Sequence, residues 1–154
     1  MAFNPNDMSS LEDHLGYWIR LISNHVSHAF SRSLESQGVT VAEWVVLREL
    51  WELEQTTPSK LAEHLGMTRG AISKLVERLI GKSLVNRSFD EVDRRCQNIE
   101  LSDAGRRLVP QLAELADQND AAFFGYLDES QRKSLMNLLR GVAEQHHFKD
   151  RPVD

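Results

Sequence analysis

The chain of 154 residues has little of several features that mark common protein classes. It has one cysteine, Cys96, so no disulfide can form within the chain, which is typical of a reducing compartment. No apolar run approaches the length of a membrane span, and residues 1–10 lack the basic and apolar stretches of a secretory signal. We therefore expect a cytoplasmic protein with no membrane partner.

Sequence signatures of catalysis and metal binding are also missing. The chain has no P-loop, no dinucleotide-binding glycine fingerprint and no His-Glu-x-x-His motif. His25 and His28 are spaced to share a helix face, and His146 and His147 are adjacent. No cysteine or carboxylate cluster completes a tetrahedral site around either pair. We predict no enzyme, no cofactor and no metal site.

Positive charge is scarce overall but locally concentrated. The net charge of −5 by itself argues against a nucleic-acid-binding protein. Residues 69–107, however, contain nine Lys or Arg and six Asp or Glu, which gives +3, whereas the remainder has nine basic and seventeen acidic residues, which gives −8. Because a phosphate backbone responds to the local field, the segment 69–107 is the candidate DNA-binding surface.

Residues 58–82 have the spacing of a helix-turn-helix. Ala62 is small enough to let two helices approach, and Ile72 is an apolar residue that can seat the second helix on the first. Gly66 between them suits a left-handed turn, where a Cβ would clash. Such a unit presents its second helix, here 68–82, to the major groove of DNA.

A β-hairpin and long helices are predicted around this unit. Residues 85–89 and 97–101 alternate between apolar and polar side chains on either side of a polar turn, as in an antiparallel hairpin. We expect a long first helix that starts at Ser9, with Glu12 completing a capping box, and ends near Gly38. A further long helix follows the hairpin, and Pro110 inside it either kinks it or splits it in two. The other expected N-caps are Thr40 with Glu43, Thr57, Thr68, Ser102, and Asp128 with Gln131.

The predicted fold is mainly α with a small β-wing. Residues 39–103 form a winged helix-turn-helix DNA-binding domain, and residues 1–36 and 104–148 form a helical dimerisation region. The flanking helices carry more apolar residues than one small domain can bury, so we predict a homodimer around a two-fold axis. A dimer would place its recognition helices roughly 34 Å apart on a pseudo-palindromic operator. The alternative is a monomer with a larger helical core.

The order of these elements resembles the MarR family of winged helix-turn-helix regulators. The resemblance runs from about Leu11 to His147, and three motifs carry it: Gly38-Val39-Thr40-x-x-Glu43-Trp44, Asp93-Arg94-Arg95, and Leu101-Ser102-x-x-Gly105. It implies a dimeric DNA-binding transcriptional regulator, commonly a repressor, that a small aromatic or phenolic effector, or oxidation, releases from DNA. The alternative function is a winged-helix protein–protein interaction module without specific DNA binding, which would need an apolar recognition face.

The candidate DNA contacts lie on the recognition helix and the wing. Arg69 can bind guanine O6 and N7 in a bidentate fashion, and Arg95 suits a narrow minor groove. By resemblance, Asp93 pairs with Arg95 and orients it. Glu77 either accepts a hydrogen bond from cytosine or, more ordinarily, pairs with Lys74 or Arg78. The full predicted set is Ser59, Lys60, Thr68, Arg69, Gly70, Ser73, Lys74, Arg87, Asp93, Arg94 and Arg95; the alternative is that these are solvated surface side chains.

A possible small-molecule effector site follows from the same resemblance, because relatives bind ligands between the dimer helices and the DNA-binding lobe. The residues that would form it here are Trp18, His25, His28, Trp44 and Arg48. Aromatic rings with a His or Arg suit an aromatic carboxylate. The alternative is that the tryptophans fill a core or an interface and the histidines lie on the surface. A separate hypothesis is that oxidation of Cys96, expected on a wing strand, loosens DNA binding.

Overall fold

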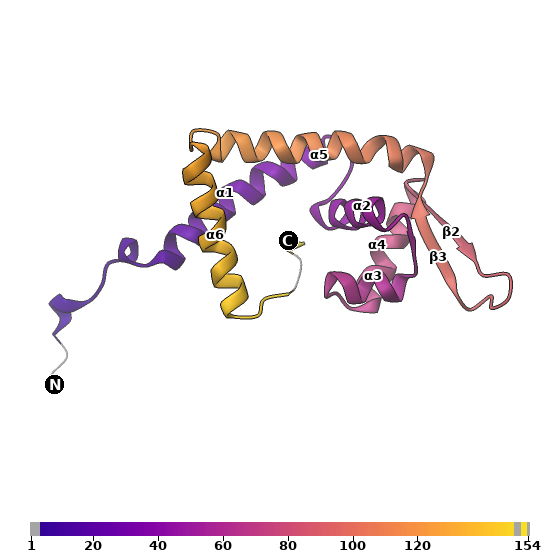
Figure 1. The fold of residues 1–154 in the computed structure, drawn as a ribbon, viewed down its shortest axis with the longest axis horizontal. Coiled ribbons are helices and arrows are strands. Elements are labelled where there is room, and N and C mark those ends of the chain that lie inside the picture. Colours follow the sequence, from indigo (N-terminus) through magenta and orange to yellow (C-terminus); the bar gives the residue numbers. More distant parts are fainter. Residues whose placement is uncertain (1–3, 150–151, 154) are drawn as a thin grey trace.

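The computed structural model describes residues 4–149 and 152–153, and this part of the chain is mainly helical. Figure 1 shows α5 lying beside α1 and α2, with the wing at one end of α5 and α6 at its other end. The mainly α fold with a small β-wing is confirmed. The elements are α1 (Leu15–Glu35), α2 (Val41–Leu53), β1 (Gln55–Thr56), α3 (Pro58–Leu65), α4 (Arg69–Gly81), β2 (Val85–Phe89), β3 (Gln97–Leu101), α5 (Asp103–Phe124) and α6 (Glu129–Gln145).

Side-chain caps begin most of the helices, as the sequence predicts. Thr40 and Glu43 form the reciprocal capping box at the start of α2, where the Thr40 N–H donates to the Glu43 carboxylate at 3.0 Å. Gly66 ends α3 in the left-handed conformation, with φ of 66°. The remaining predicted caps are also present: Thr57, Thr68, Ser102, and Asp128 with Gln131.

The start of the first helix differs from the prediction. The capping box expected for Ser9 and Glu12 is wrong, because Ser10 and Asp13 form it around a short 3₁₀ turn, and α1 begins only at Leu15. The Ser10 N–H donates to the Asp13 carboxylate at 2.8 Å. This backbone bond, with a second from the Ser10 side chain, lowers the pKa of Asp13.

The β-sheet has a third strand that sequence reasoning missed. β3 lies between β1 and β2 and pairs antiparallel with both, so that Thr56 faces Ile99 on one side and Arg87 faces Ile99 on the other. The two-residue strand β1 is too short to show an alternating pattern. Its pairing ties the end of α2 to the base of the wing.

The long helix after the wing is continuous. α5 passes through Pro110 as one helix, so the alternative of two separate helices is wrong. Leu112, two residues beyond the proline, is fully buried, and packing of this kind holds a helix together where one backbone hydrogen bond is missing. α5 therefore spans from the wing to α6 (Figure 1).

The hydrophobic core belongs to the winged-helix domain. α2, α3, α4, the wing base and the first half of α5 supply nearly all of the buried apolar side chains, whereas α1 contributes only Leu34 and α6 contributes none among the described residues. Large apolar side chains on α1 and α6 remain exposed in a single chain: Leu15, Trp18, Ile19, Ile22, Leu138, Leu139 and Val142. Among residues 4–149 and 152–153, no helix combines the length and apolar character needed to cross a membrane.

The wing, the end of α4 and the start of α5 pack closely against one another. The Ser102 hydroxyl donates to the carbonyl of Ser83 at 2.7 Å, and the Ser102 N–H donates to the carbonyl of Leu84 at 3.0 Å. Gly105, one turn into α5, packs directly on this segment, and a Cβ there would overlap the Leu84 carbonyl oxygen. Only glycine lets α5 approach the backbone so closely.

We expect Gly105→Ala to lower the free energy of unfolding by about 3 kcal/mol, because the new methyl group forces two backbone segments apart. Urea unfolding at fixed protein concentration measures this change. Gly81→Ala, near open space at the end of α4, is the matched control and should leave stability equal or raise it by about 0.5–1 kcal/mol. Equal stability of the two variants would contradict the packing role of Gly105.

An ion pair between a buried carboxylate and a partly exposed lysine connects the start of α2 to the end of α4. Glu43 is only 1% exposed, and its carboxylate lies 2.7 Å from the ammonium group of Lys82. The same ammonium group donates to the carbonyl of Gly38 at 2.7 Å. A carboxylate buried to this degree needs such partners, because an unpaired buried charge is strongly unfavourable.

We expect Glu43→Ala to cost about 3 kcal/mol of stability, since it removes the helix cap and leaves Lys82 without its carboxylate. The measurement is again urea unfolding. Glu52→Gln, which breaks the exposed Arg48–Glu52 pair on the same helix, is the control and should cost less than about 0.5 kcal/mol. A loss below about 1 kcal/mol for Glu43→Ala would show that Lys82 and Thr40 are satisfied without it.

Candidate DNA-binding surface

α3 and α4 pack as the helix-turn-helix spacing predicts. Ala62 and Ile72 are 3% and 0% exposed, so the small residue and the apolar anchor both lie in the interface. The N–H of Met67 donates to the carbonyl of Ala62 at 3.0 Å, which closes the turn around Gly66. The two helices therefore hold a fixed angle, and the polar face of α4 is free to meet a ligand.

The exposed face of α4 carries the predicted polar residues. Arg69, Gly70, Ser73 and Lys74 are all exposed at the N-terminal half of the helix. A Cβ at Gly70 would meet no atom within 4 Å, so another molecule can approach the backbone closely there. The Thr68 hydroxyl accepts a hydrogen bond from the Ala71 N–H at 3.1 Å, so Thr68 caps α4. The contact of Thr68 with DNA stays a prediction.

The start of α3 carries two more of the predicted contacts. Ser59 and Lys60 are exposed in the first turn of the helix, where free backbone N–H groups and the helix dipole favour a phosphate. Thr57 already uses its hydroxyl to cap the Lys60 N–H at 3.2 Å.

The wing carries two exposed arginines on an ordered turn. Arg94 and Arg95 are fully on the surface between β2 and β3. The Asp93 carboxylate accepts the backbone N–H of Arg95 at 3.0 Å. Among the described residues no ion pair joins Asp93 to the Arg95 guanidinium, so Asp93 orders the main chain rather than the side chain that the resemblance implied.

Arg87 joins the wing to the recognition helix. Its guanidinium lies 2.6 Å from the carboxylate of Glu77, whereas sequence reasoning paired Glu77 with Lys74 or Arg78 and gave Arg87 to phosphate. The structural reason is that α4 packs on β2, which brings the last turn of the exposed face next to the strand. Only the three-dimensional packing reveals this pair.

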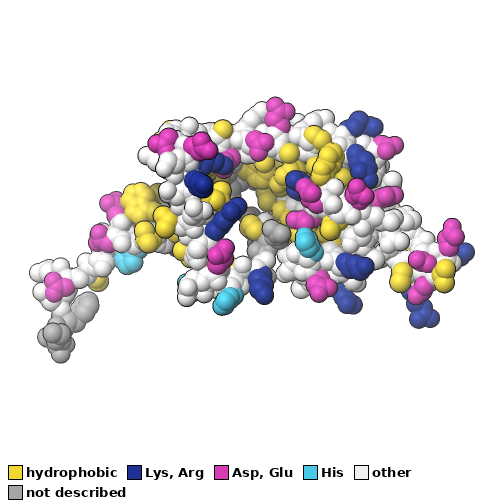
Figure 2. Space-filling view, in the orientation of Figure 1, with side chains coloured by type: hydrophobic (Ala, Val, Ile, Leu, Met, Phe, Trp, Pro, Cys, Tyr) yellow, Lys and Arg dark blue, Asp and Glu magenta, His cyan; other side chains and the backbone are white. Residues whose placement is uncertain are grey.

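The cations that remain at the surface point to an anionic partner. Within residues 4–149, no ion pair engages Arg69, Lys74, Arg94 or Arg95. Figure 2 shows basic side chains below α3 and α4 and at the wing, where acidic and apolar side chains accompany them. Four cations without an internal partner, on two elements of one rigid domain, form a surface suited to a phosphate backbone.

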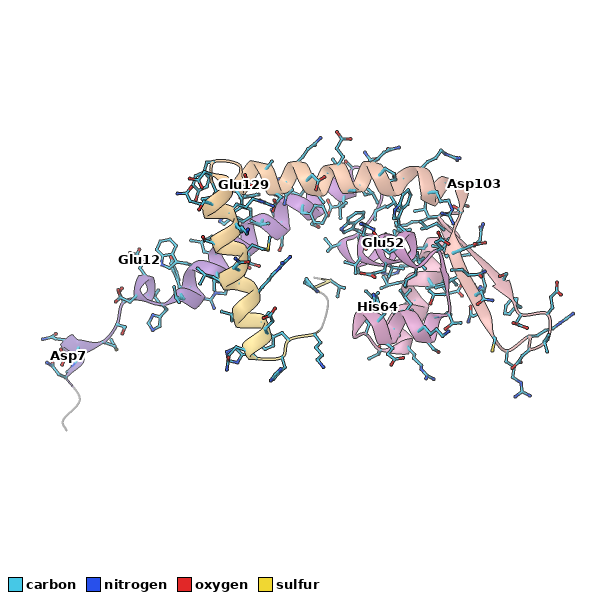
Figure 3. The ribbon with its side chains drawn as sticks, in the orientation of Figure 1. Asp7, Glu12, Glu52, His64, Asp103 and Glu129 are labelled. Carbon is cyan, nitrogen blue, oxygen red and sulfur yellow. The ribbon has the colours of Figure 1, made fainter. Side chains whose placement is uncertain are left out.

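A hollow of about 360 Å³ lies between α1 and α2. Trp44 and Arg48 from the predicted effector set line it, and Trp44 packs edge-on against Phe30 with 6.4 Å between ring centres. The Arg48 guanidinium is held 2.6 Å from Glu52, which Figure 3 labels on α2. Sequence reasoning missed Phe30, whose place in the helical apolar stripe marked it only as a core residue. The hollow is lined by Ser27, Phe30, Val41, Trp44, Val45, Arg48, Glu49 and Pro152.

The other predicted effector and sensing residues lie elsewhere. Trp18 is 43% exposed and donates its indole N–H to the carbonyl of Glu12 at 2.9 Å. His25 and His28 are exposed on α1 and do not line the hollow. Cys96 is exposed in the wing turn, one residue before β3, rather than on the strand. In the described part of the chain, potential metal ligands nowhere gather in groups of three.

Comparison with known proteins identifies the type of the winged-helix domain. Residues 39–97, the winged helix-turn-helix itself, match the MarR family. The HTH-type transcriptional regulator MgrA of Staphylococcus aureus is 25% identical over 138 residues, which cover 89% of this chain and 92% of MgrA. Residues 39–97 therefore form a MarR-type winged helix-turn-helix domain.

Solved structures of similar regulators share the whole fold. BpsR of Bordetella bronchiseptica, studied for regulation of its DNA binding by 6-hydroxynicotinic acid, has a TM-score of 0.75 at 24% identity and covers 88% of this chain and 97% of its own. CouR from Rhodococcus jostii RHA1, bound to p-coumaroyl-CoA, has a TM-score of 0.74 at 25% identity and covers 88% and 96%. The matched domain and these relatives support a DNA-binding transcriptional regulator of the MarR type.

Proposed function

We propose that this protein is a homodimeric repressor of the MarR type that binds a pseudo-palindromic operator and releases it on binding an aromatic or phenolic effector. The observation that carries the proposal is the exposed cation set on α4 and the wing, which no internal carboxylate neutralises among the described residues. An interaction module for apolar protein partners would instead expose an apolar face on α4.

The dimer accounts for the unburied apolar side chains outside the winged-helix core. Ile19 on α1 is 53% exposed and Leu138 on α6 is 71% exposed, although both lie on apolar helix stripes. A second copy packed against α1 and α6 would remove these stripes from water, which is the main driving force of association. On this basis residues 1–36 and 104–148 form the dimerisation region and residues 39–103 form the DNA-binding domain.

Each exposed group has a role on DNA that suits its chemistry. Arg69 reads guanine in the major groove, with Thr68, Gly70, Ser73 and Lys74 beside it. Arg95 enters the minor groove, where a narrow A·T tract concentrates negative potential. Backbone phosphates are bound by Ser59, Lys60 and Arg94, with Asp93 ordering the turn. Arg87 has further N–H donors for a phosphate beside its ion pair with Glu77.

The hollow between α1 and α2 is the proposed effector site. Trp44 and Phe30 provide an aromatic wall, and Arg48 provides a cation for a carboxylate. The proposal is supported by BpsR and CouR, whose ligands are a hydroxylated aromatic acid and a phenolic acyl thioester.

We expect Arg69→Ala to weaken operator binding about 10- to 100-fold, because one bidentate contact to guanine is worth about 1–3 kcal/mol. Arg95→Ala should weaken binding to a similar degree. The measurement is fluorescence anisotropy at 150 mM salt, with a duplex selected from a random pool and a scrambled duplex of the same length.

Arg78→Ala is the matched control for these variants. Arg78 is also exposed on α4, but nine residues from Arg69 and therefore half a turn around the helix axis, so its loss should change affinity less than about threefold. Binding of the wild-type protein without preference for any duplex would contradict sequence-specific regulation. A stoichiometry of one chain per duplex would contradict the dimer.

We expect p-coumarate or 6-hydroxynicotinate to raise the melting temperature by about 5 °C at a hundredfold excess over the dissociation constant, since a ligand that binds only the folded form stabilises it by about 2.7 kcal/mol. Arg48→Met should abolish the shift. Arg32→Met, on an exposed arginine outside the hollow, should preserve it. An equal shift in both variants would place the effector elsewhere.

A further inference from the structure

The wing turn, residues 90–96, is closed by hydrogen bonds at its base and within it. The Asp90 N–H donates to the carbonyl of Cys96 at 2.9 Å, which extends the β2–β3 ladder by one step. The Cys96 N–H donates to the carbonyl of Asp93 at 3.0 Å and closes a β-turn around Arg94 and Arg95. The two arginines therefore stand on a defined backbone.

The side chain of Asp90 fixes the other half of the turn. One oxygen, Oδ1, accepts the backbone N–H of Val92 at 2.8 Å and that of Asp93 at 3.2 Å. These bonds, the Val92 bond first, lower the pKa of Asp90. The Asp90 carboxylate thus satisfies the N–H groups of Val92 and Asp93, which lie outside the β2–β3 hydrogen-bond ladder.

An acid at this position needs a reason, because the turn faces a polyanion in the proposed complex. Asp90, Glu91 and Asp93 lie within two to five residues of Arg95 and oppose its attraction to phosphate. Glu91 makes no hydrogen bond or ion pair among the described residues, so it contributes only charge. Asp90 contributes charge of the same sign but also binds the backbone.

We propose that Asp90 is a positioning residue for DNA binding, whose carboxylate holds the turn 90–96 in the shape that presents Arg94 and Arg95 to the duplex. Without this cap the turn would become ordered only on binding DNA. The conformational entropy lost in that step would weaken binding. The inference rests on the proposed function, and it reaches beyond the Asp93-Arg94-Arg95 motif to a residue outside it.

The test compares Asp90→Ala with Glu91→Ala in the full-length protein. Both variants remove one negative charge next to the arginines, so an effect of charge alone would strengthen operator binding equally in both. We expect Asp90→Ala to bind the selected operator about three- to tenfold more weakly than wild type, a loss comparable with that of a helix cap. Glu91→Ala should bind as tightly as wild type or more tightly.

Asp90→Asn provides the rescue, because its amide oxygen can still accept the Val92 and Asp93 N–H groups. It should bind at least as tightly as wild type. All three variants should melt within about 2 °C of wild type, since the turn is exposed and lies outside the core. Equal affinity of Asp90→Ala and Glu91→Ala, or no rescue by asparagine, would overturn the proposal.

Amide hydrogen exchange separates this inference from the proposed function. The Val92 and Asp93 amides should exchange faster in Asp90→Ala than in wild type and Glu91→Ala, with no DNA present. Unchanged exchange would overturn the positioning role of Asp90 whatever the DNA result. The exchange could instead change as expected while the wild-type protein prefers no duplex. That result would count against the proposed function and against the DNA-binding part of this inference, but not against the hydrogen bonds of Asp90.

Discussion

The close approach of α5 to the segment after α4 is the constraint on which the DNA-binding surface depends. Ser102 bonds to the carbonyls of both Ser83 and Leu84, and Gly105 leaves room for the Leu84 carbonyl against the first turn of α5. Asp103, labelled in Figure 3, marks the point where β3 becomes α5. The end of the recognition helix, both wing strands and the long helix toward the proposed dimer region therefore meet at one junction. The orientation of the wing relative to α4 follows from it.

Two ion pairs around α4 engage acidic side chains and, within residues 4–149, leave other cations of this acidic protein without an ion-pair partner. Glu43 binds Lys82 at the C-terminal end of the helix, and Glu77 binds Arg87 on the adjacent strand. Both acids thereby engage cations that support the fold, while Arg69 and the wing-tip arginines have no ion-pair partner among the described residues. The net charge of −5 is thus compatible with DNA binding, because the proposed DNA-binding surface has its own local charge balance.

The sequence predicted features that neighbouring residues determine, and it missed contacts between segments that are distant in the chain. The left-handed Gly66, the apolar spacing of α3 and α4 and four caps depend on a few neighbouring residues, and all are confirmed; the caps are Thr40, Thr57, Thr68 and Ser102. The two-residue β1, the Glu77–Arg87 pair and the place of Phe30 in the hollow depend on which segments pack together. The shift of the first capping box to Ser10 is a different kind of miss, since Ser10 and Asp13 have the same three-residue spacing as Ser9 and Glu12.

The hollow and the DNA-binding surface are connected through α2. In the proposed function, an effector lowers DNA affinity only by the difference between its affinities for the two forms of the dimer, and a hundredfold release requires about 2.7 kcal/mol. Phe30 belongs to α1 and Trp44 to α2, so the separation of these helices is what an aromatic ligand would set. Glu43, one residue before Trp44, forms an ion pair with Lys82 at the end of α4. In the proposed function, a ligand that changes the position of α2 would act on the recognition helix through this pair, which resists stretching because its separation would leave the buried Glu43 carboxylate unpaired.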